Sequence, residues 1–375
     1  VLWEFSDANS TYMGYSYSEP RIALLNNNKW AVIFGNGYNS DNGKAALIIL
    51  YIEGGIDGTW VLNSDYKIID TGVGDAANKS GIGEITAIDL DNDFVVDRIY
   101  GSGIDGKLWA FDLSDSNASN WDVAYGTSSN KKPLFTSSSG QPITVKSAIT
   151  RVADSTIADA PNVLVILGTG QFITDADPSN TNQQSLYGVW DAGESEITRA
   201  DLVEQTLDSS TTSSLRVMSD NTVTYNTANP SSGDLGWFFD LPESGERVNI
   251  DPVVRLEQVF FATNIPSTQK CTDGGGSGWI MILDAENGGE PSRGGFDLNS
   301  DGNFDSNDQL SNTFVAGVKF DNGLPAGLGF LGGSGNLYVT GTGGGTNILD
   351  SVSTQKIKTI SFGAKGRLAW KELFE

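Results

Sequence analysis

The sequence predicts an all-β protein and favours a β-propeller over a multi-sheet sandwich. Glycine accounts for 45 of the 375 residues, or 12 %, against a typical share of about 7 %. Aromatic residues make up 10 % of the chain and include nine tryptophans. Short apolar runs recur around glycine-containing turns. A chain of this length suits a propeller better, because sandwiches of this size normally split into two domains.

The predicted strands come in pairs, with a turn or loop rich in small residues between the two members. Glycine suits tight hairpin turns because it adopts positive φ angles without steric cost. Antiparallel hairpins cannot each bury a face alone, so they must stack or close into a ring. The pairs span 30–34 and 45–51, 97–100 and 108–113, 163–167 and 186–191, 259–263 and 279–284, and 327–331 and 337–340, and a last strand spans 367–373.

Residues from about 191 to 236 form the least regular part of the sequence. We interpret them as an insertion in a single propeller domain that covers 1–375. Within them, the string TRADLVEQTL (198–207) predicts one short helix, with Thr198 as its N-cap and Asp201 as the capping-box acid. The first residues read as the middle of a strand, so we expect the chain to be a fragment of a longer protein.

Charge and missing residue types exclude several functions. The chain has 23 basic and 47 acidic residues, and its net charge of −24 disfavours nucleic-acid binding. It has no histidine, so catalytic Ser-His-Asp or Cys-His groups and the usual zinc sites cannot form. Cys271 is the one cysteine, which leaves no internal disulfide. The longest apolar run, 45–52, is far shorter than the roughly 20 residues that cross a bilayer.

The string DLDNDFVVD (89–97) has the spacing of a calcium loop. Its carboxylates stand at relative positions 1, 3, 5 and 9, and in a loop that wraps a point the carbonyl of position 7 joins them. The flexible cage of six or seven oxygens suits calcium better than magnesium. The alternative is an acidic turn left in water. The predicted ligands are Asp89, Asp91, Asp93, the carbonyl of Val95, and Asp97.

A second loop, DLNSDGNFDSND (297–308), matches the twelve-residue calcium pattern at positions 1, 3, 5 and 6. Gly302 supplies the sharp turn at position 6, and position 12 is aspartate instead of glutamate. The preceding string NGGEPSRGGF cannot form the helix of a regular EF-hand. The alternative is a solvated turn rich in Asp and Asn. The predicted ligands are Asp297, Asn299, Asp301, the carbonyl of Asn303, Asp305 and Asp308.

Several strings together resemble the C-terminal domain of the PilY/PilC family, which acts in type IV pilus biogenesis and adhesion. They occur in the family's order and cover nearly the whole chain. The first calcium loop is one of them, so the family's calcium site maps onto Asp89, Asp91, Asp93, Val95 and Asp97. The matching strings lie at 14–22, 32–40, 89–115, 133–144, 163–172, 183–191, 236–248 and 367–373.

The resemblance implies an all-β, modified β-propeller of about seven irregular blades, with long insertions and at most short helices. It implies a bacterial, surface-exposed location at the pilus or outer membrane. Our leading hypothesis is a calcium-stabilised binding and regulatory domain without enzymatic activity. Expected partners are minor pilins and other pilus components, host or abiotic surfaces, and the missing N-terminal region of the same chain. In the family, calcium at the first loop is associated with the balance between pilus extension and retraction.

The sequence is also compatible with two other functions. A quinoprotein-like dehydrogenase also uses a propeller, tryptophans and a carboxylate-held calcium ion, but it requires a pocket for the quinone. A lectin-like adhesin uses exposed aromatic side chains. We expect one calcium ion at the first loop and a second at 297–308.

Overall fold

In the computed structural model the chain divides into two compact units, which we describe separately. Among the described residues, unit 1 contains those up to Ser147 together with Gly193–Thr198, and unit 2 contains Ala148–Ala192 and the residues from Arg199 onward. The structure describes residues 2–152, 157, 160–268, 275–299, 301, 303–321, 323–330, 337–343 and 352–353. Cys271 and the predicted strand at 367–373 lie outside the described residues.

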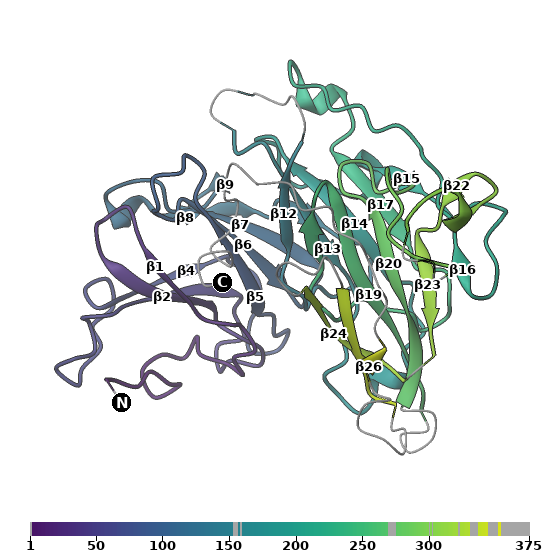
Figure 1. Cartoon of the computed structure of the whole chain (residues 1–375). Coiled ribbons are helices and arrows are strands. Elements are labelled where there is room, and N and C mark those ends of the chain that lie inside the picture. Colours follow the sequence, from purple (N-terminus) through teal and green to yellow (C-terminus); the bar gives the residue numbers. More distant parts are fainter. Residues whose placement is uncertain are drawn as a thin grey trace. The chain divides into compact units, whose positions relative to one another are not determined.

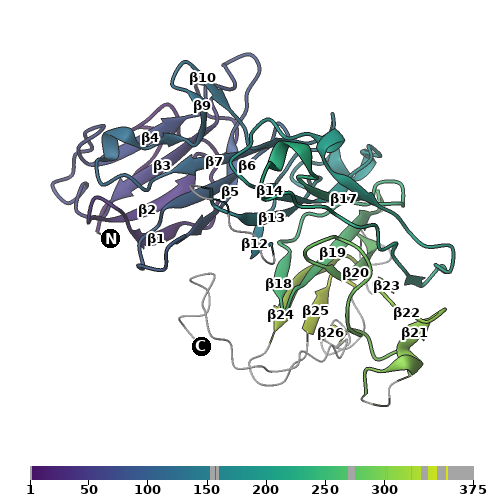
Figure 2. The same cartoon turned by 90° about the horizontal axis from the view of Figure 1, so that it is seen from above.

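Unit 1 contains two large antiparallel sheets. Figure 2 shows β1 to β4 of the first sheet side by side, in the order β1-β2-β3-β4. The second sheet has the order β11-β7-β6-β5, and β8 also pairs with β7. The strands are β1 Arg21–Leu24, β2 Trp30–Gly35, β3 Ala46–Tyr51, β4 Tyr66–Asp70, β5 Ile82–Ile88, β6 Arg98–Gly103, β7 Lys107–Asp112, β8 Asp122–Val123 and β11 Phe135–Thr136, with a small β9–β10 hairpin of Tyr125–Thr127 and Asn130–Lys132.

Unit 2 contains two five-stranded sheets, of order β12-β13-β14-β17-β15 and β16-β23-β20-β19-β18, and a three-stranded sheet, β24-β25-β26. Figure 1 shows β13, β14 and β17 next to one another at the centre of the first of these. The strands are β12 Ala148–Arg151, β13 Val163–Gly168, β14 Ser185–Asp191, β15 Val203–Gln205, β16 Leu215–Arg216, β17 Gly236–Asp240, β18 Val253–Arg255, β19 Gln258–Pro266, β20 Gly276–Asp284, β23 Gly317–Phe320, β24 Pro325–Phe330, β25 Leu337–Gly341 and β26 Val352–Ser353, with a small β21–β22 hairpin of Gln309–Leu310 and Thr313–Phe314.

The helices among the described residues are single turns of 3₁₀ type. They are η1 Ala118–Asn120, η2 Asp177–Ser179, η3 Arg199–Asp201, η4 Pro230–Ser232 and η6 Ser306–Asp308. None of them has the length and hydrophobicity that a membrane-spanning helix needs. The prediction of an all-β chain with at most short helices is confirmed.

The predicted hairpins are confirmed where the structure describes them. The antiparallel pairs β2–β3, β6–β7, β13–β14, β19–β20 and β24–β25 correspond to the five strand pairs expected from the sequence. Their central strands are buried on both faces: every residue of β3, β6, β13 and β14 is buried. Continuous apolar runs such as ALIILY and VLVILG therefore mark strands covered on both sides. Five sheets of three or more strands occur among the described residues, and the number of about seven blades stays a prediction.

The helix predicted at 198–207 is wrong. The segment forms η3 and then β15, which pairs in parallel with β17 from Val203 to Gln205. The guanidinium of Arg199 donates two hydrogen bonds to the Asp240 carboxylate, of 2.7 and 2.6 Å, and holds the segment against the sheet. Pairing with a buried strand has overridden the local helical preference. The segment interpreted as an insertion thus supplies short strands to two sheets.

A buried ion pair braces the second sheet of unit 2. Arg216 of β16 donates hydrogen bonds of 2.7 and 2.8 Å to the two carboxylate oxygens of Glu246. The side chain of Arg216 is 1 % exposed and that of Glu246 is 0 % exposed. The hydroxyl of Thr263 in β19 donates a third hydrogen bond to Glu246, of 2.6 Å. Because both charges are desolvated, the pair is stable only while both partners are present.

We predict that Glu246→Gln lowers the free energy of unfolding by about 3–5 kcal/mol, because the buried Arg216 charge then loses its fully buried counter-ion and keeps only the 3.4 Å contact with the more exposed Glu243. Urea unfolding at pH 7 measures the change. The control is Glu257→Gln, which breaks the exposed pair with Arg293 and is expected to have an effect below about 1 kcal/mol. Equal effects of the two substitutions would contradict the assignment of Arg216 and Glu246 as the buried brace.

Candidate metal centre

The first loop brings three of its four carboxylates together. Oxygens of Asp89, Asp91 and Asp97 lie within 4.8 Å of one another, and among the described residues no other group of three or more acids does so. The loop connects β5 to β6, so its two ends are fixed by adjacent buried strands. Asp97 is buried, whereas Asp91 and Asp93 are exposed. The group is thus open to solvent on one side and anchored on the other.

Backbone amides shape this loop around its own carboxylates. Asp89 accepts hydrogen bonds from the amides of Asn92 at 2.7 Å and Phe94 at 2.8 Å. Asp93 lies outside the close group and accepts from the amide of Val95 at 2.8 Å. The predicted role of the Val95 carbonyl as a ligand stays a prediction. These amide contacts direct the loop around the point where the carboxylate oxygens converge.

Asp97 closes the loop. One of its oxygens accepts from the amide of Leu90 at 2.8 Å, and the other accepts from the side chain of Asn26 at 3.1 Å. Burial raises the pKa of the Asp97 carboxyl group; the hydrogen bonds from Leu90 and Asn26 lower it, and the charges of Asp91 and Asp89 raise it. A cation that neutralises the charges of Asp89 and Asp91 stabilises the ionised form of Asp97.

The second loop repeats some of the backbone contacts of the first loop. In the first loop the amide of Asp93 donates to Asp89 at 3.3 Å and to Asp91 at 3.2 Å. In the second loop the amide of Asp301 donates in the same way to Asp297 at 3.2 Å and to Asn299 at 3.0 Å. The amide of Asn303 donates to Asp301 at 2.7 Å, and this contact is one cause of the lowered pKa of that carboxyl group. The two loops therefore share the amide contacts made by positions 5 and 7.

The loops differ in how they close. In the second loop the closing acid is Asp308, which is 1 % exposed and accepts from the amides of Leu298 at 2.7 Å and Asp305 at 3.1 Å. Asp305 caps η6, and this extra turn moves the buried acid from relative position 9 to position 12. No three carboxylates of its described residues converge as those of the first loop do. The remaining predicted oxygen ligands here are the Asn299 side chain and the Asn303 carbonyl.

The donor set of the first loop fits calcium. All of its side-chain donors are carboxylate oxygens, which hard cations prefer, and the loop sequence contains no histidine and no cysteine to select a softer metal. The loop is preformed, with its charged oxygens already directed to one side. Asp89, Asp91 and Asp97 would hold the ion, with Asp93 and the Val95 carbonyl as the further predicted ligands.

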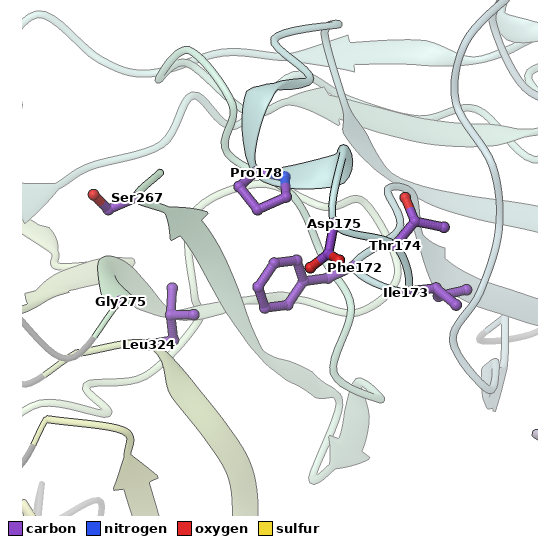
Figure 3. A pocket seen from close by; sticks show the side chains of 8 residues that line it. All are labelled: Phe172, Ile173, Thr174, Asp175, Pro178, Ser267, Gly275 and Leu324. Carbon is purple, nitrogen blue, oxygen red and sulfur yellow. The ribbon is translucent and has the colours of Figure 1, made fainter. Parts of the chain in front are cut away.

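A separate pocket lies in unit 2 (Figure 3). Its volume is about 580 Å³, and none of its lining residues belongs to either loop. The adjoining segment is braced by Asp177, which accepts from the Gln171 side chain and from the amides of Ile173 and Thr174 at 2.6–2.7 Å. Burial raises the pKa of Asp177, but these hydrogen bonds outweigh burial and lower it. The lining residues are Phe172, Ile173, Thr174, Asp175, Pro178, Ser267, Gly275 and Leu324.

Comparison with known proteins identifies the family. The sequence model of the PilY1 beta-propeller domain matches residues 6–221, which is more than half of the chain. The chain belongs to the PilY1 β-propeller family. This confirms both the predicted propeller and the resemblance to the PilY/PilC proteins.

Individual members of the PilY1 family agree with this assignment. The type IV pilus biogenesis factor PilY1 homolog of Xylella fastidiosa is 33 % identical over 314 residues, which cover 78 % of this chain and 21 % of that protein. Type IV pilus biogenesis factor PilY1 of Pseudomonas aeruginosa is 32 % identical over 360 residues, 85 % of this chain and 30 % of that protein. The chain therefore spans less than a third of these relatives.

The structure of this chain is also similar to that of a solved member of the family. The crystal structure of the Pseudomonas aeruginosa PilY1 C-terminal domain superposes with a TM-score of 0.73 at 27 % sequence identity. The match covers 95 % of this chain and 74 % of that chain.

The turn of the first loop places a bulky residue where glycine is favoured. Phe94 has φ = 71° and is 64 % exposed, and Gly302 stands at the matching position of the second loop. We predict that Phe94→Gly leaves the free energy of unfolding in calcium-free buffer unchanged or raises it by up to about 1 kcal/mol, because backbone strain is relieved.

The same substitution at Phe111, which is fully buried in β7, is the control for that experiment. It is expected to lower the free energy of unfolding by at least about 3 kcal/mol, measured by urea unfolding. A loss of more than about 1 kcal/mol with Phe94→Gly would show instead that the Phe94 ring packs within the folded unit.

Proposed function

We propose that this chain is a calcium-binding, non-enzymatic domain of a type IV pilus biogenesis factor. The observation that carries the proposal is the convergence of Asp89, Asp91 and Asp97 within 4.8 Å on a turn already shaped by backbone amides. Like charges held this close favour a divalent cation at the same point. Membership of the PilY1 family supplies the pilus context.

In the organism, calcium at the first loop takes part in the balance between pilus extension and retraction and in surface attachment. The partners are minor pilins and other pilus components, host or abiotic surfaces, and the remaining part of a longer polypeptide. The domain acts outside the bacterial cell, at the pilus or outer membrane, where calcium is abundant. The net charge of −24 suits a soluble exposed surface and disfavours nucleic acid as a partner.

We propose further that the second loop binds a second calcium ion. Its amides at positions 5 and 7 make the same contacts as those of the first loop, and its buried closing acid Asp308 corresponds to Asp97. The two loops lie in different units, so each ion stabilises a different part of the chain. A cation bound only by the folded state at 100 times its dissociation constant adds about 2.7 kcal/mol to the free energy of unfolding.

We predict two calcium ions per chain in the purified protein after dialysis against micromolar calcium, measured by inductively coupled plasma mass spectrometry. Asp97→Ala and Asp301→Asn each reduce the content to one ion, because each removes a ligand from one loop. Asp7→Asn, which removes one exposed charge of unit 1 outside both loops, retains two ions. Wild-type protein without bound calcium, and with a melting temperature that chelator does not change, would refute the proposed function.

We predict no alcohol oxidation when the chain is supplied with calcium and pyrroloquinoline quinone, measured by a dye-coupled assay against a protein-free blank. The reason is that Asp91 and Asp93 of the first loop are exposed to solvent, and no residue of the loop lines the pocket of unit 2. Turnover above the blank would replace the non-enzymatic proposal with a quinoprotein-like dehydrogenase.

A further inference from the structure

Asn26 connects the first calcium loop to a distant turn of the chain. It lies between β1 and β2, and its side-chain nitrogen lies 3.1 Å from an oxygen of Asp97, 3.0 Å from the Leu113 carbonyl and 3.3 Å from the Val96 carbonyl. The two hydrogens of the amide nitrogen are thus shared among three acceptors. All three acceptors belong to segments more than 65 residues away in the sequence, at or after the loop.

The contact fixes the orientation of a predicted ligand. One Asp97 oxygen is held by the Leu90 amide from within the loop, and the other is held by Asn26 from outside it. With both oxygens directed, rotation of the carboxylate away from Asp89 and Asp91 breaks a hydrogen bond. Groups that hold a metal-binding carboxylate in this way commonly change metal affinity 10- to 100-fold when they are removed.

The same residue lies on an element that the loop touches through the backbone. The amide of Val96 donates to the Leu24 carbonyl at 3.1 Å, which joins the end of the loop to β1. The turn itself is closed by hydrogen bonds from the Asn28 amide to the Leu25 carbonyl at 2.8 Å and from the Leu25 amide to the Lys29 carbonyl at 3.1 Å. A change in the position of Asp97 therefore reaches this turn directly through Asn26.

We propose that Asn26 is a positioning residue for the first calcium site and couples occupancy of that site to the turn between β1 and β2. This inference rests on the proposed function. The cation favours the carboxylate position that Asn26 holds, and by linkage the same cation stabilises the contact and the turn that carries it. The hairpin bears the exposed side chains of Ile22 and Trp30, so calcium acts on an element with an apolar surface.

The test compares Asn26→Ala with Asn27→Ala. Asn27 lies in the same turn and is half-buried like Asn26, but its side-chain nitrogen donates to the Tyr51 hydroxyl at 3.1 Å. Calcium affinity is measured by isothermal titration in an Asp301→Asn background, so that the titration reports the first loop. Asn26→Ala is expected to raise the dissociation constant 10- to 100-fold, whereas Asn27→Ala changes it less than twofold.

A second variant covers the case in which Asn26→Ala does not fold. Asn26→Ser keeps one side-chain donor and is expected to give an intermediate loss of affinity. A purely structural role would lower the melting temperature equally with and without calcium while the dissociation constant stays within twofold of wild type, and this result would overturn the proposal.

Hydrogen exchange of the backbone amides tests the coupling itself. In the wild type, saturating calcium is expected to slow exchange both in the loop (89–97) and in the turn (25–29). In Asn26→Ala at saturating calcium, exchange slows in the loop alone. Equal protection of the turn in the variant would overturn the coupling, whereas absence of calcium binding in the wild type would refute the proposed function and this inference together.

Discussion

Fully buried central strands control the architecture of three of the four large sheets among the described residues. In β3, β6, β13 and β14 every residue is buried, so each of these three sheets has two faces that must be removed from water. A single hairpin cannot achieve this, and stacking of several sheets satisfies both faces of each. In unit 1 the shared core includes Ile33 and Ile49 from the first sheet and Ile99 and Phe111 from the second. Both candidate metal loops lie in connections between strands.

The candidate metal centre depends on that same stacking. The first loop begins at the end of β5 and finishes at the start of β6, two antiparallel neighbours whose register is fixed by burial. Asp97 sits at the buried end, where its position is set by the sheet, while Asp89 and Asp91 stand on the turn. The strands thus hold one predicted ligand, and local amide contacts arrange the other predicted ligands.

The second loop forms similar local hydrogen bonds between backbone amides and side chains, but it lies in unit 2. Its amides at positions 5 and 7 make the same contacts as those of the first loop, although its closing acid comes three residues later, in the turn η6. Acids and Asn at alternate positions accept hydrogen bonds from the amides that follow them, and this preference belongs to the sequence itself. The number of residues between the first acid and the buried closing acid depends on the element that follows, which is β6 in the first loop and η6 in the second.

The sequence by itself determined five of the strand pairs that form hairpins and the spacing of both loops. These features depend on neighbours in the chain: apolar runs between glycine turns, and carboxylates at alternate positions. The tertiary structure decided the rest. The segment 198–207 became η3 and β15 because β17 offered a pairing edge and Asp240 a partner for Arg199. Which carboxylates converge, and the contact of Asn26 with Asp97 from 71 residues away, followed from packing that no local pattern encodes.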